Sequence, residues 1–185
     1  FMRYTEDFFD YYKSKMIHKE AKPNNAHIVL ARLEQVGKLK AVITQNIDGL
    51  HQMAGSREVL ELHGSVHRNY CMKCGRFFDL DYVVSSSGVP RCDKCGGIVK
   101  PDVVLYEESL DTDIINKSVR YIAGAEALIV AGTSLTVYPA AGLIRYFSGK
   151  HLVLINKTPT PYDSLATLVI NESIGETLKK ACPEL

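Results

Sequence analysis

Apolar residues recur along the chain at two alternating spacings, which predict two kinds of secondary structure. Spacings of three and four residues predict amphipathic helices over residues 4–20, 26–36, 111–123, 140–147 and 174–181. Short continuous apolar runs predict strands over residues 40–45, 59–62, 127–132, 151–156 and 167–170. Strands that are apolar along their whole length are typical of a parallel sheet buried between helices. The pattern therefore predicts an α/β fold with a parallel sheet flanked by helices.

Polar residues mark the places where the first two helices begin. Thr5 and Asn25 have side chains that can accept a hydrogen bond from the free N–H groups of a helix N-terminus, and we expect both to be N-caps. Gly37 follows the last apolar position of the second helix, and we expect that helix to end there.

The alternation of helices and strands stops between residues 66 and 101, where the composition changes. This stretch holds two cysteine pairs, several glycine and serine residues, and short strand-like pieces such as residues 77–84. The change predicts a small module inserted into the α/β fold.

The four paired cysteines predict a metal site. Cys71 and Cys74 form one CxxC pair, and Cys92 and Cys95 form a second pair after 17 intervening residues. This spacing matches a zinc ribbon, in which two turns place four thiolates around one Zn²⁺ ion. Because protein would fill all four positions, we expect one structural zinc ion that stabilises the module. A redox pair of dithiols is the alternative, and Cys182 is expected to be a small buried residue.

Composition and charge exclude several classes of partner. With 22 Lys and Arg residues against 21 Asp and Glu residues, the formal net charge is +1, so we expect no specific nucleic-acid partner. No apolar run approaches the roughly 20 residues of a membrane span, and the first residues lack the layout of a signal peptide. We therefore expect a cytoplasmic protein without a membrane partner, and in this reducing compartment the five cysteines are not expected to form a disulfide framework.

Three of the predicted strands end in polar residues with ligand-binding groups. These residues are Gln45, Asn46, Asp48 and His51 after residues 40–44, Gly132, Thr133 and Ser134 after residues 127–131, and Asn156 after residues 151–155. In an open parallel sheet, ligands bind outside the carboxyl ends of the strands. Taken alone, each loop is more often an ordinary turn than a ligand site, because Asn, Asp, Gly and Ser favour turns.

Several segments read together resemble one enzyme family. The segments are TQNIDGLHQMAGS, ELHGS, the two CxxC pairs, KPDVVLYEE, GTSLTVYPAAGL and LINKTPTPYD. Their order and spacing are similar to those of the sirtuins, the NAD-dependent protein deacylases, and most of all to the bacterial branch. The resemblance spans nearly the whole chain.

The resemblance implies a domain organisation. Residues 24–65 and 102–185 would form a Rossmann-like NAD-binding domain, residues 66–101 the zinc-ribbon module, and residues 1–23 the helical part of the small domain. In sirtuins, NAD and an acylated lysine of the substrate protein meet in the cleft between the large and small domains.

The resemblance also assigns roles to the residues of the first polar loop. Gln45, Ile47 and Asp48 would line the pocket around the nicotinamide and its ribose, and Asn46 would position a catalytic water or the ribose hydroxyls. An Asp carboxylate can accept a hydrogen bond from the nicotinamide amide. His63 matches the general base of the family, since an imidazole suits proton transfer near neutral pH.

The reaction implied by the resemblance begins with attack of the acetyl oxygen on C1′ of the nicotinamide ribose, which releases nicotinamide and leaves an alkylimidate. His63 would then deprotonate a ribose hydroxyl, which attacks the imidate carbon. The products would be free lysine, nicotinamide and O-acetyl-ADP-ribose.

Further site residues are carried over from the same resemblance. Val104 would accept a hydrogen bond from the acyl-lysine N–H through its carbonyl, and Leu105 and Tyr106 would pair with the substrate peptide. Contacts to the adenosine side of NAD would come from Gly132, Thr133, Ser134 and Asn156, with Ile174 near the adenine.

The remaining ionisable residues are expected to have structural roles or to be solvated. We expect His51 to support the fold, the other histidines outside the motifs to be surface or packing residues, and Lys100 and Lys157 to be solvated. The histidines in question are His18, His27, His67 and His151.

The sequence departs from the sirtuin pattern at two places. The glycine-rich GAGxS segment and the PDFR loop, which hold the NAD diphosphate and cover the nicotinamide in the family, are not found. We therefore expect a truncated sequence, and we expect a polypeptide of these residues alone to bind NAD poorly and to have little activity. Glu107 stands where the family often has Gly, so the floor of the acyl-lysine tunnel is expected to differ.

Two other functions are compatible with such a fold. The first is NAD-dependent transfer of ADP-ribose to a protein nucleophile, and the second is non-catalytic binding of acylated peptides. The presence of Asn46, Asp48 and His63 favours deacylation over both alternatives.

Overall fold

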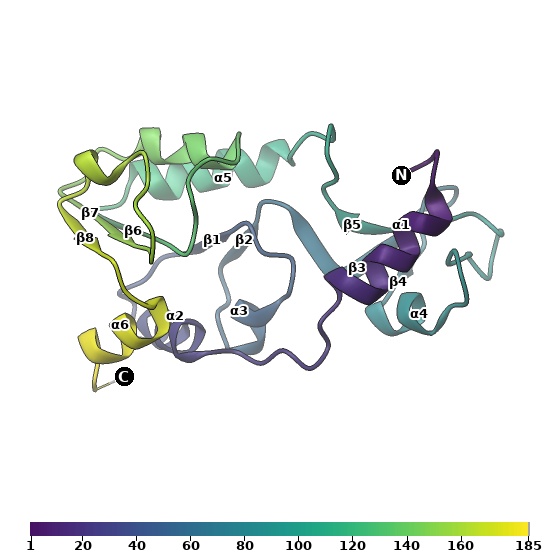
Figure 1. Ribbon diagram of the computed structural model, residues 1–185, viewed down its shortest axis with the longest axis horizontal. Coiled ribbons are helices and arrows are strands. Elements are labelled where there is room, and N and C mark those ends of the chain that lie inside the picture. The colour runs from purple at the N-terminus through teal and green to yellow at the C-terminus, as the bar shows by residue number, and fades with distance from the viewer. Residues whose placement is uncertain (185) are drawn as a thin grey trace. The chain divides into compact units, whose positions relative to one another are not determined.

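The computed structural model describes residues 1–184, which form two compact units. Unit 1 contains residues 1–21, 46–49 and 63–109, and unit 2 contains residues 22–45, 50–62 and those from Leu110 onward. Figure 1 labels the helices and strands of each unit. Within the described residues, no helix combines the length and the apolar character needed to cross a membrane.

Unit 2 is an α/β arrangement with parallel strands. Its elements are α2 (Asn25–Gln35), β1 (Val42–Thr44), α3 (Leu50–Met53), β2 (Val59–Glu61), α5 (Thr112–Ala123), β6 (Ala127–Ala131), η2 (Ala140–Tyr146), β7 (His151–Ile155), η3 (Asp163–Leu165), β8 (Leu168–Ile170) and α6 (Ile174–Ala181). Strand β1 pairs in parallel with β2, and β6, β7 and β8 form a second parallel sheet in that order. These pairings confirm the α/β class predicted from the apolar runs.

Helices cover both faces of the sheet formed by β6, β7 and β8. Because successive side chains of a strand point to opposite faces, β7 contributes Val153 and Ile155 to one face and Leu152 and Leu154 to the other. The first pair packs into a cluster with residues of α2 and α6, which lie side by side in Figure 1. The second pair packs into a cluster with residues of η2.

Strand β6 is less buried than the sequence pattern predicted. It is an edge strand of the described sheet, with β7 as its neighbour. Ile129 in its middle is 41% exposed, so burial on both faces is wrong for this strand. The burial expected from an apolar run needs neighbours on both sides, and an edge strand lacks one of them.

Unit 1 is built on an antiparallel sheet that packs against a helix. Its elements are α1 (Thr5–Tyr11), the π-helix η1 (Tyr12–Met16), β3 (Gly64–Cys71), β4 (Phe77–Phe78), α4 (Leu80–Ser85) and β5 (Val99–Val103). The strand order is β4, β3, β5, with antiparallel pairing throughout. The fully buried side chains of Phe9, Tyr12, Val83 and Val99 form the centre of the core.

Both predicted N-caps of the first two helices are wrong by one residue. Asn24 caps α2, because its side-chain oxygen accepts hydrogen bonds from the N–H groups of Ala26 and His27, whereas Asn25 already belongs to the helix. Residue Tyr4 is the N-cap of α1. Thr5 is already the first residue of the helix, and its hydroxyl donates back to the carbonyl of Phe1.

Three elements of the structure differ in type from the elements predicted from the sequence. The first helix changes from α to π geometry after Tyr11 and ends at Met16 rather than near residue 20. Residues 77–84 contain a two-residue strand followed by α4, because Asp79 accepts a hydrogen bond from the Tyr82 N–H and starts a helix there. Residues 140–146 form a 3₁₀ helix, which is longer than most helices of this geometry.

Candidate functional site

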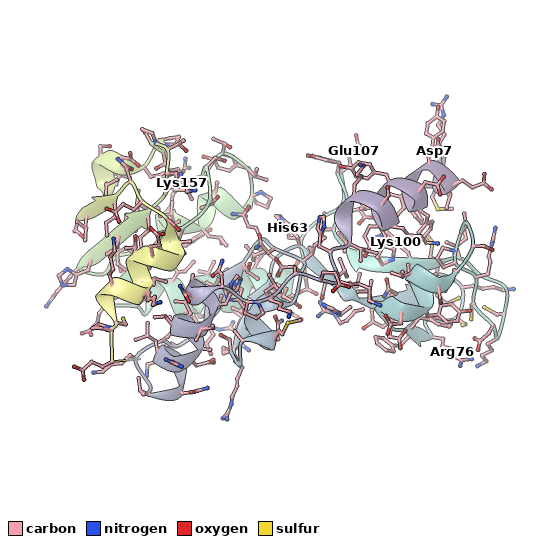
Figure 2. All side chains as sticks on the ribbon, turned by 60° about the horizontal axis from the view of Figure 1, so that its bottom comes forward. Asp7, His63, Arg76, Lys100, Glu107 and Lys157 are labelled. Atoms are coloured by element: carbon pink, nitrogen blue, oxygen red, sulfur yellow. The ribbon has the colours of Figure 1, made fainter. Side chains whose placement is uncertain are left out.

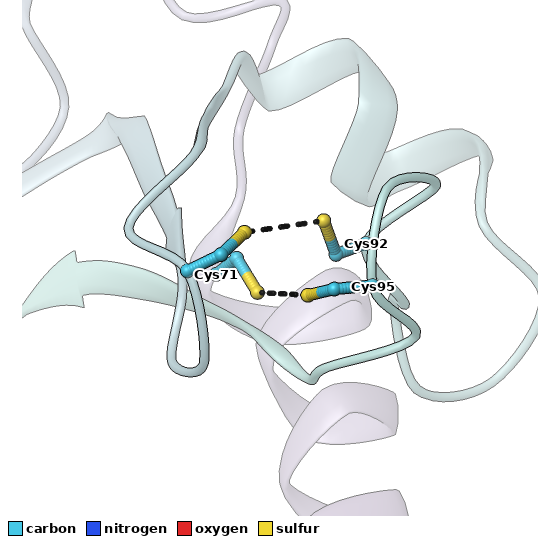
Figure 3. A group of neighbouring side chains, drawn as sticks. Cys71, Cys92 and Cys95 are labelled. Carbon is cyan, nitrogen blue, oxygen red and sulfur yellow. Dashed lines mark hydrogen bonds between the residues drawn. The ribbon is translucent and has the colours of Figure 1, made fainter.

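The four paired cysteines form one cluster in unit 1. Figure 3 shows their sulfur atoms facing one another across the two turns. The Sγ atoms of Cys71 and Cys95 are 3.4 Å apart, those of Cys74 and Cys92 are 3.7 Å apart, and all four lie within 4.8 Å of one another. Tetrahedral ligation at a Zn–S distance of about 2.3 Å requires sulfur atoms roughly 3.8 Å apart. The cluster therefore fits a zinc ion, as the CxxC spacing predicted.

The thiols of this cluster influence one another's ionisation. Burial raises the pKa of Cys71, but hydrogen bonds from the backbone N–H groups of Cys74 and Lys73 and from neighbouring thiols lower it to about 6. For Cys95, the Gly97 N–H lowers the pKa, but hydrogen bonds with the other thiols and burial raise it to about 12. Without a cation the cluster thus keeps part of its protons, whereas a divalent metal ion favours four thiolates.

The first polar loop is held against strand β3 within unit 1. The Val66 N–H donates to the carbonyl of Ile47 at 3.0 Å, and His67 Nε2 donates to the carbonyl of Asp48 at 3.1 Å. Inside the loop, Asn46 Nδ2 donates to the Asp48 carboxylate at 3.3 Å. Asn46, Ile47 and Asp48 are therefore fixed as a group by the beginning of β3.

His67 was expected to be a surface or packing residue, and the sequence did not reveal its contact with the loop. Its exposed ring lies over Gly49, where an added Cβ would approach the ring to 2.8 Å. Gly49 also has a φ of +71°, so glycine is favoured there both by conformation and by the neighbouring imidazole. No local sequence pattern signals this contact, because the two residues are far apart in the chain.

His63 lies between β2 and β3 and is partly buried (Figure 2). Its carbonyl accepts a hydrogen bond from the Val104 N–H at 3.1 Å, and Gly64 pairs with Val103 in the register of β3 and β5. The proposed general base and the proposed substrate-binding residue are thus neighbours in one ladder of unit 1. Gln45, in contrast, follows β1 and belongs to unit 2.

The segment after β5 is braced by an ion pair. Lys100 Nζ lies 3.1 Å from the Glu108 carboxylate and donates to the Val103 carbonyl at 3.2 Å, while the Leu105 N–H donates to Glu108 at 2.9 Å. The expectation that Lys100 is solvated is therefore wrong, because its ammonium group is bound from two sides. Partial burial raises the pKa of Glu108, but the Leu105 N–H and Lys100 outweigh it and hold the pKa below its ordinary value.

Two residues at the tip of this segment are unusual. The Tyr106 side chain is fully exposed, and Glu107 has a φ of +72°, in the left-handed region that favours glycine. Glu107 is the residue that replaces the Gly of the sirtuin pattern, and Figure 2 labels it together with Lys100. Glu107 thus has a backbone conformation that is typical of glycine, although it carries a side chain.

The other two polar loops follow adjacent strands of unit 2. The Gly132 N–H, just after β6, donates to the Ile155 carbonyl at the end of β7 at 3.1 Å. Thr133 Oγ1 accepts a hydrogen bond from the Leu135 N–H at 3.2 Å. Ser134 shares a hydroxyl hydrogen bond of 2.6 Å with Thr136, and Asn156 Nδ2 donates to the Thr158 carbonyl at 2.8 Å. The parallel pairing of β6 and β7 therefore brings these residues to one edge of the sheet.

Ile174 and His51 lie at packing positions. Ile174 is the first residue of α6 and packs, partly buried, against the cluster that includes Ala26 and Leu178. His51 lies on α3, with its ring centroid 4.6 Å from that of His27, as expected for a residue that supports the fold.

Comparison with known proteins identifies close relatives. A model described as the Sir2 family matches residues 1–139. The NAD-dependent protein deacetylase of Clostridium acetobutylicum is 66% identical over 180 residues, covering 97% of this chain and 74% of the relative. The protein of the same name from Clostridium tetani is 64% identical over 186 residues, covering 100% of this chain and 75% of the relative.

Solved structures agree with these relatives. A structure titled "Sir2-p53 peptide-NAD+" superposes with a TM-score of 0.92 at 40% identity, covering 100% of this chain and 79% of the other. A complex of Sir2 with an inhibitor, 2′-O-acetyl-ADP-ribose and a deacetylated p53 peptide also gives a TM-score of 0.92, at 40% identity and with 100% and 81% coverage. These similarities confirm the fold and the family resemblance drawn from the motifs.

Proposed function

The chain belongs to the Sir2 family and catalyses NAD-dependent deacetylation of lysines in proteins, and on this premise we propose that His63 is the general base of the reaction. The observation that carries the proposal is the gathering of three groups at the start of β3. These are His63 itself, the loop of Asn46 and Asp48 bound by Val66 and His67, and Val104 bound to the His63 carbonyl. An imidazole beside a loop of hydrogen-bonding groups suits proton abstraction from a ribose hydroxyl.

In this proposal the first loop binds the nicotinamide half of NAD. The Asp48 carboxylate accepts a hydrogen bond from the nicotinamide amide, and Gln45 and Ile47 complete the lining of the pocket. Asn46, which donates to Asp48, is in place to orient a water molecule or a ribose hydroxyl. The adenosine half is contacted by Gly132, Thr133, Ser134 and Asn156, with Ile174 near the adenine.

The acylated substrate is bound by the segment after β5. The Val104 carbonyl accepts a hydrogen bond from the N–H of the acyl-lysine, and Leu105 and Tyr106 pair with the peptide backbone as an added strand. The brace of Lys100 and Glu108 supports this assignment, since it holds the backbone of residues 103–105 in a fixed shape. Main-chain pairing makes the choice of substrate sequence permissive.

Zinc has a structural role in this account. Protein sulfur atoms supply all four ligands of a tetrahedral site, so no position is left for a reacting water molecule. We place the protein in the cytoplasm as part of the same proposal, because a reducing compartment keeps these thiols available to the metal.

The replacement His63→Ala in the full-length protein tests the role of the imidazole. We expect deacetylation to fall by at least about a hundredfold, with the zinc content unchanged near one ion per chain. His151→Ala is the matched control, because His151 is an exposed histidine at the start of β7, outside the proposed site. Retained activity in His63→Ala, or loss of its zinc, would contradict the proposed division of roles.

A further inference from the structure

Two tyrosine hydroxyl groups join the loops that carry the proposed adenosine contacts. Tyr138 follows the Gly132–Thr133–Ser134 segment after β6, and Tyr162 follows Asn156 after β7. Their hydroxyl oxygens are 3.1 Å apart, within hydrogen-bonding distance. We call Tyr138 and Tyr162 the tyrosine pair.

Tyr162 is the fixed member of the pair. Its side chain is 8% exposed and packs in a core cluster with Leu135 and Leu154. Its backbone N–H donates to Thr160 Oγ1 at 3.2 Å, and Thr160 in turn donates to the Asp163 carboxylate at 2.6 Å. The ring and the backbone of Tyr162 are therefore both held by the body of unit 2.

Tyr138 is the exposed member of the pair. Its side chain is 60% exposed, so burial of its ring contributes little to the core. The other side-chain hydrogen bonds of its loop, from Leu135 to Thr133 and between Ser134 and Thr136, are internal to the loop. They fix the local shape of the loop but not its distance from Asn156. The Gly132 N–H ties the start of the loop to the Ile155 carbonyl, and the contact of Tyr138 with Tyr162 joins the two loops by their side chains farther from the strands.

Arg145 strengthens this connection electrostatically. The hydrogen bond from Tyr138 lowers the pKa of Tyr162, and the nearby Arg145 guanidinium lowers that pKa further. The same hydrogen bond raises the pKa of Tyr138. The Arg145 guanidinium forms side-chain hydrogen bonds with the hydroxyl groups of both Tyr162 and Tyr138, and it thereby adds a charged link between them.

We propose that Tyr138 and Tyr162 are positioning residues that set the spacing between the Thr133–Ser134 loop and Asn156, and thereby the affinity for the adenosine half of NAD. The proposal rests on the proposed function, because it takes these loops as the adenosine site. Neither tyrosine needs to touch NAD in this account. Their joined hydroxyl groups restrict the motion of one loop relative to the other, so that less conformational freedom is lost on binding.

Removal of single hydroxyl groups tests the pair in the full-length protein. For Tyr138→Phe and Tyr162→Phe, we expect the KM for NAD and the Kd for ADP-ribose to rise by about threefold to tenfold, the effect of losing one hydrogen bond. The KM for the acetylated peptide and the inhibition constant of nicotinamide should stay unchanged. In the double variant, the rise of these constants should be smaller than the product of the two single-variant rises, because both single variants remove the shared bond between Tyr138 and Tyr162.

Tyr146→Phe is the matched control. Tyr146 lies in η2, is 54% exposed, and has no hydrogen bond from its hydroxyl group to other protein residues within 1–184. If the KM for NAD and the Kd for ADP-ribose are unchanged in Tyr138→Phe and Tyr162→Phe, the proposal is overturned. The proposal would also be overturned if the KM for the acetylated peptide rose as much as the KM for NAD and the melting temperature fell, because such a pattern indicates a purely structural role.

The ADP-ribose measurement separates this proposal from the deacetylation mechanism. If the wild-type protein binds ADP-ribose but His63→Ala retains full activity, the role of His63 is wrong and the tyrosine pair is still tested by binding. If the wild-type protein does not bind ADP-ribose at all, the adenosine site and the tyrosine pair are both wrong.

Discussion

The backbone at Gly64 approaches the neighbouring strand so closely that only glycine fits. Gly64 has a φ of +76°, and an added Cβ atom would overlap the backbone carbonyl oxygen of Asp102. Because backbone atoms of a paired strand cannot move aside, the close approach holds His63 beside the segment after β5. The glycine of the HG motif thus follows from packing between β3 and β5.

We predict that Gly64→Ala destabilises unit 1 by about 3 kcal/mol or more, measured by chemical denaturation. Gly88→Ala is the control, since Gly88 also has a positive φ of +60° but no atom within 4 Å of an added Cβ. In the control, the free energy of unfolding should fall by only about 1 kcal/mol, which is the usual cost of a left-handed backbone conformation for a residue with a Cβ. Equal losses in the two variants would show that the overlap with Asp102 is relieved without cost.

Glu107 stores conformational strain at the position where the family often has glycine. Its φ of +72° is unfavourable for a residue with a side chain. We therefore predict that Glu107→Gly is more stable than Glu107→Ala by about 1 kcal/mol. Both variants lack the carboxylate, so their difference in denaturation free energy reports the backbone alone. A more stable alanine variant would contradict the left-handed conformation.

At the scale of elements, the zinc cluster joins two turns of a small antiparallel sheet. Cys71 ends β3, and the opposite pair precedes β5. Cys71 and Cys92 are themselves buried in the core cluster of unit 1, so loss of metal ligation disturbs the core as well as the two turns.

We predict that Cys92→Ser abolishes stoichiometric zinc binding and removes the cooperative unfolding of unit 1, because one of the four ligands is lost. Zinc content is measured by elemental analysis, and folding by the near-ultraviolet signal of the buried aromatic cluster around Phe9 and Tyr12. Cys182→Ser is the control with a single cysteine change outside the cluster, and it should keep both signals. Persistence of the fold without zinc in Cys92→Ser would contradict this account.

The sequence predicted some elements correctly and missed others, because local spacing identifies some elements without ambiguity and fits two structures for others. Local spacing is enough to identify the cysteine pairs and the strands at Val42 and Leu154. The helix α4 was missed because a short apolar run fits either a strand or a buried helix, although Asp79 supplied a capping signal.

Candidate site residues could be predicted from the sequence where a motif lies within one segment, as for the loop from Gln45 to Asp48, and their roles stay predictions. The contacts that hold these residues could not be predicted, because they join residues that are distant in the chain. Two examples are the hydrogen bond between His67 and Asp48 and the hydrogen bond between Tyr138 and Tyr162. In each pair, only the fold brings the two residues together.

At the scale of the whole molecule, each unit carries its own share of the residues that we propose for NAD-dependent deacetylation. Unit 1 contains His63, the loop of Asn46 and Asp48, and the segment beginning at Val104, and unit 2 contains Thr133, Ser134 and Asn156 at the carboxyl ends of its parallel strands. Ligand-binding side chains at the carboxyl ends of parallel strands are what an open α/β sheet favours. Relatives at 64% and 66% identity share this activity by name.

The most direct test of the central claim is to identify the products. The full-length protein is mixed with NAD and an acetyl-lysine peptide, and the small molecules, the peptide and the protein are analysed by mass spectrometry. We predict equal amounts of nicotinamide, O-acetyl-ADP-ribose and deacetylated peptide, with the protein itself unmodified. Release of nicotinamide with ADP-ribose attached to protein and no O-acetyl-ADP-ribose would contradict deacetylation, and so would binding of the peptide without any turnover.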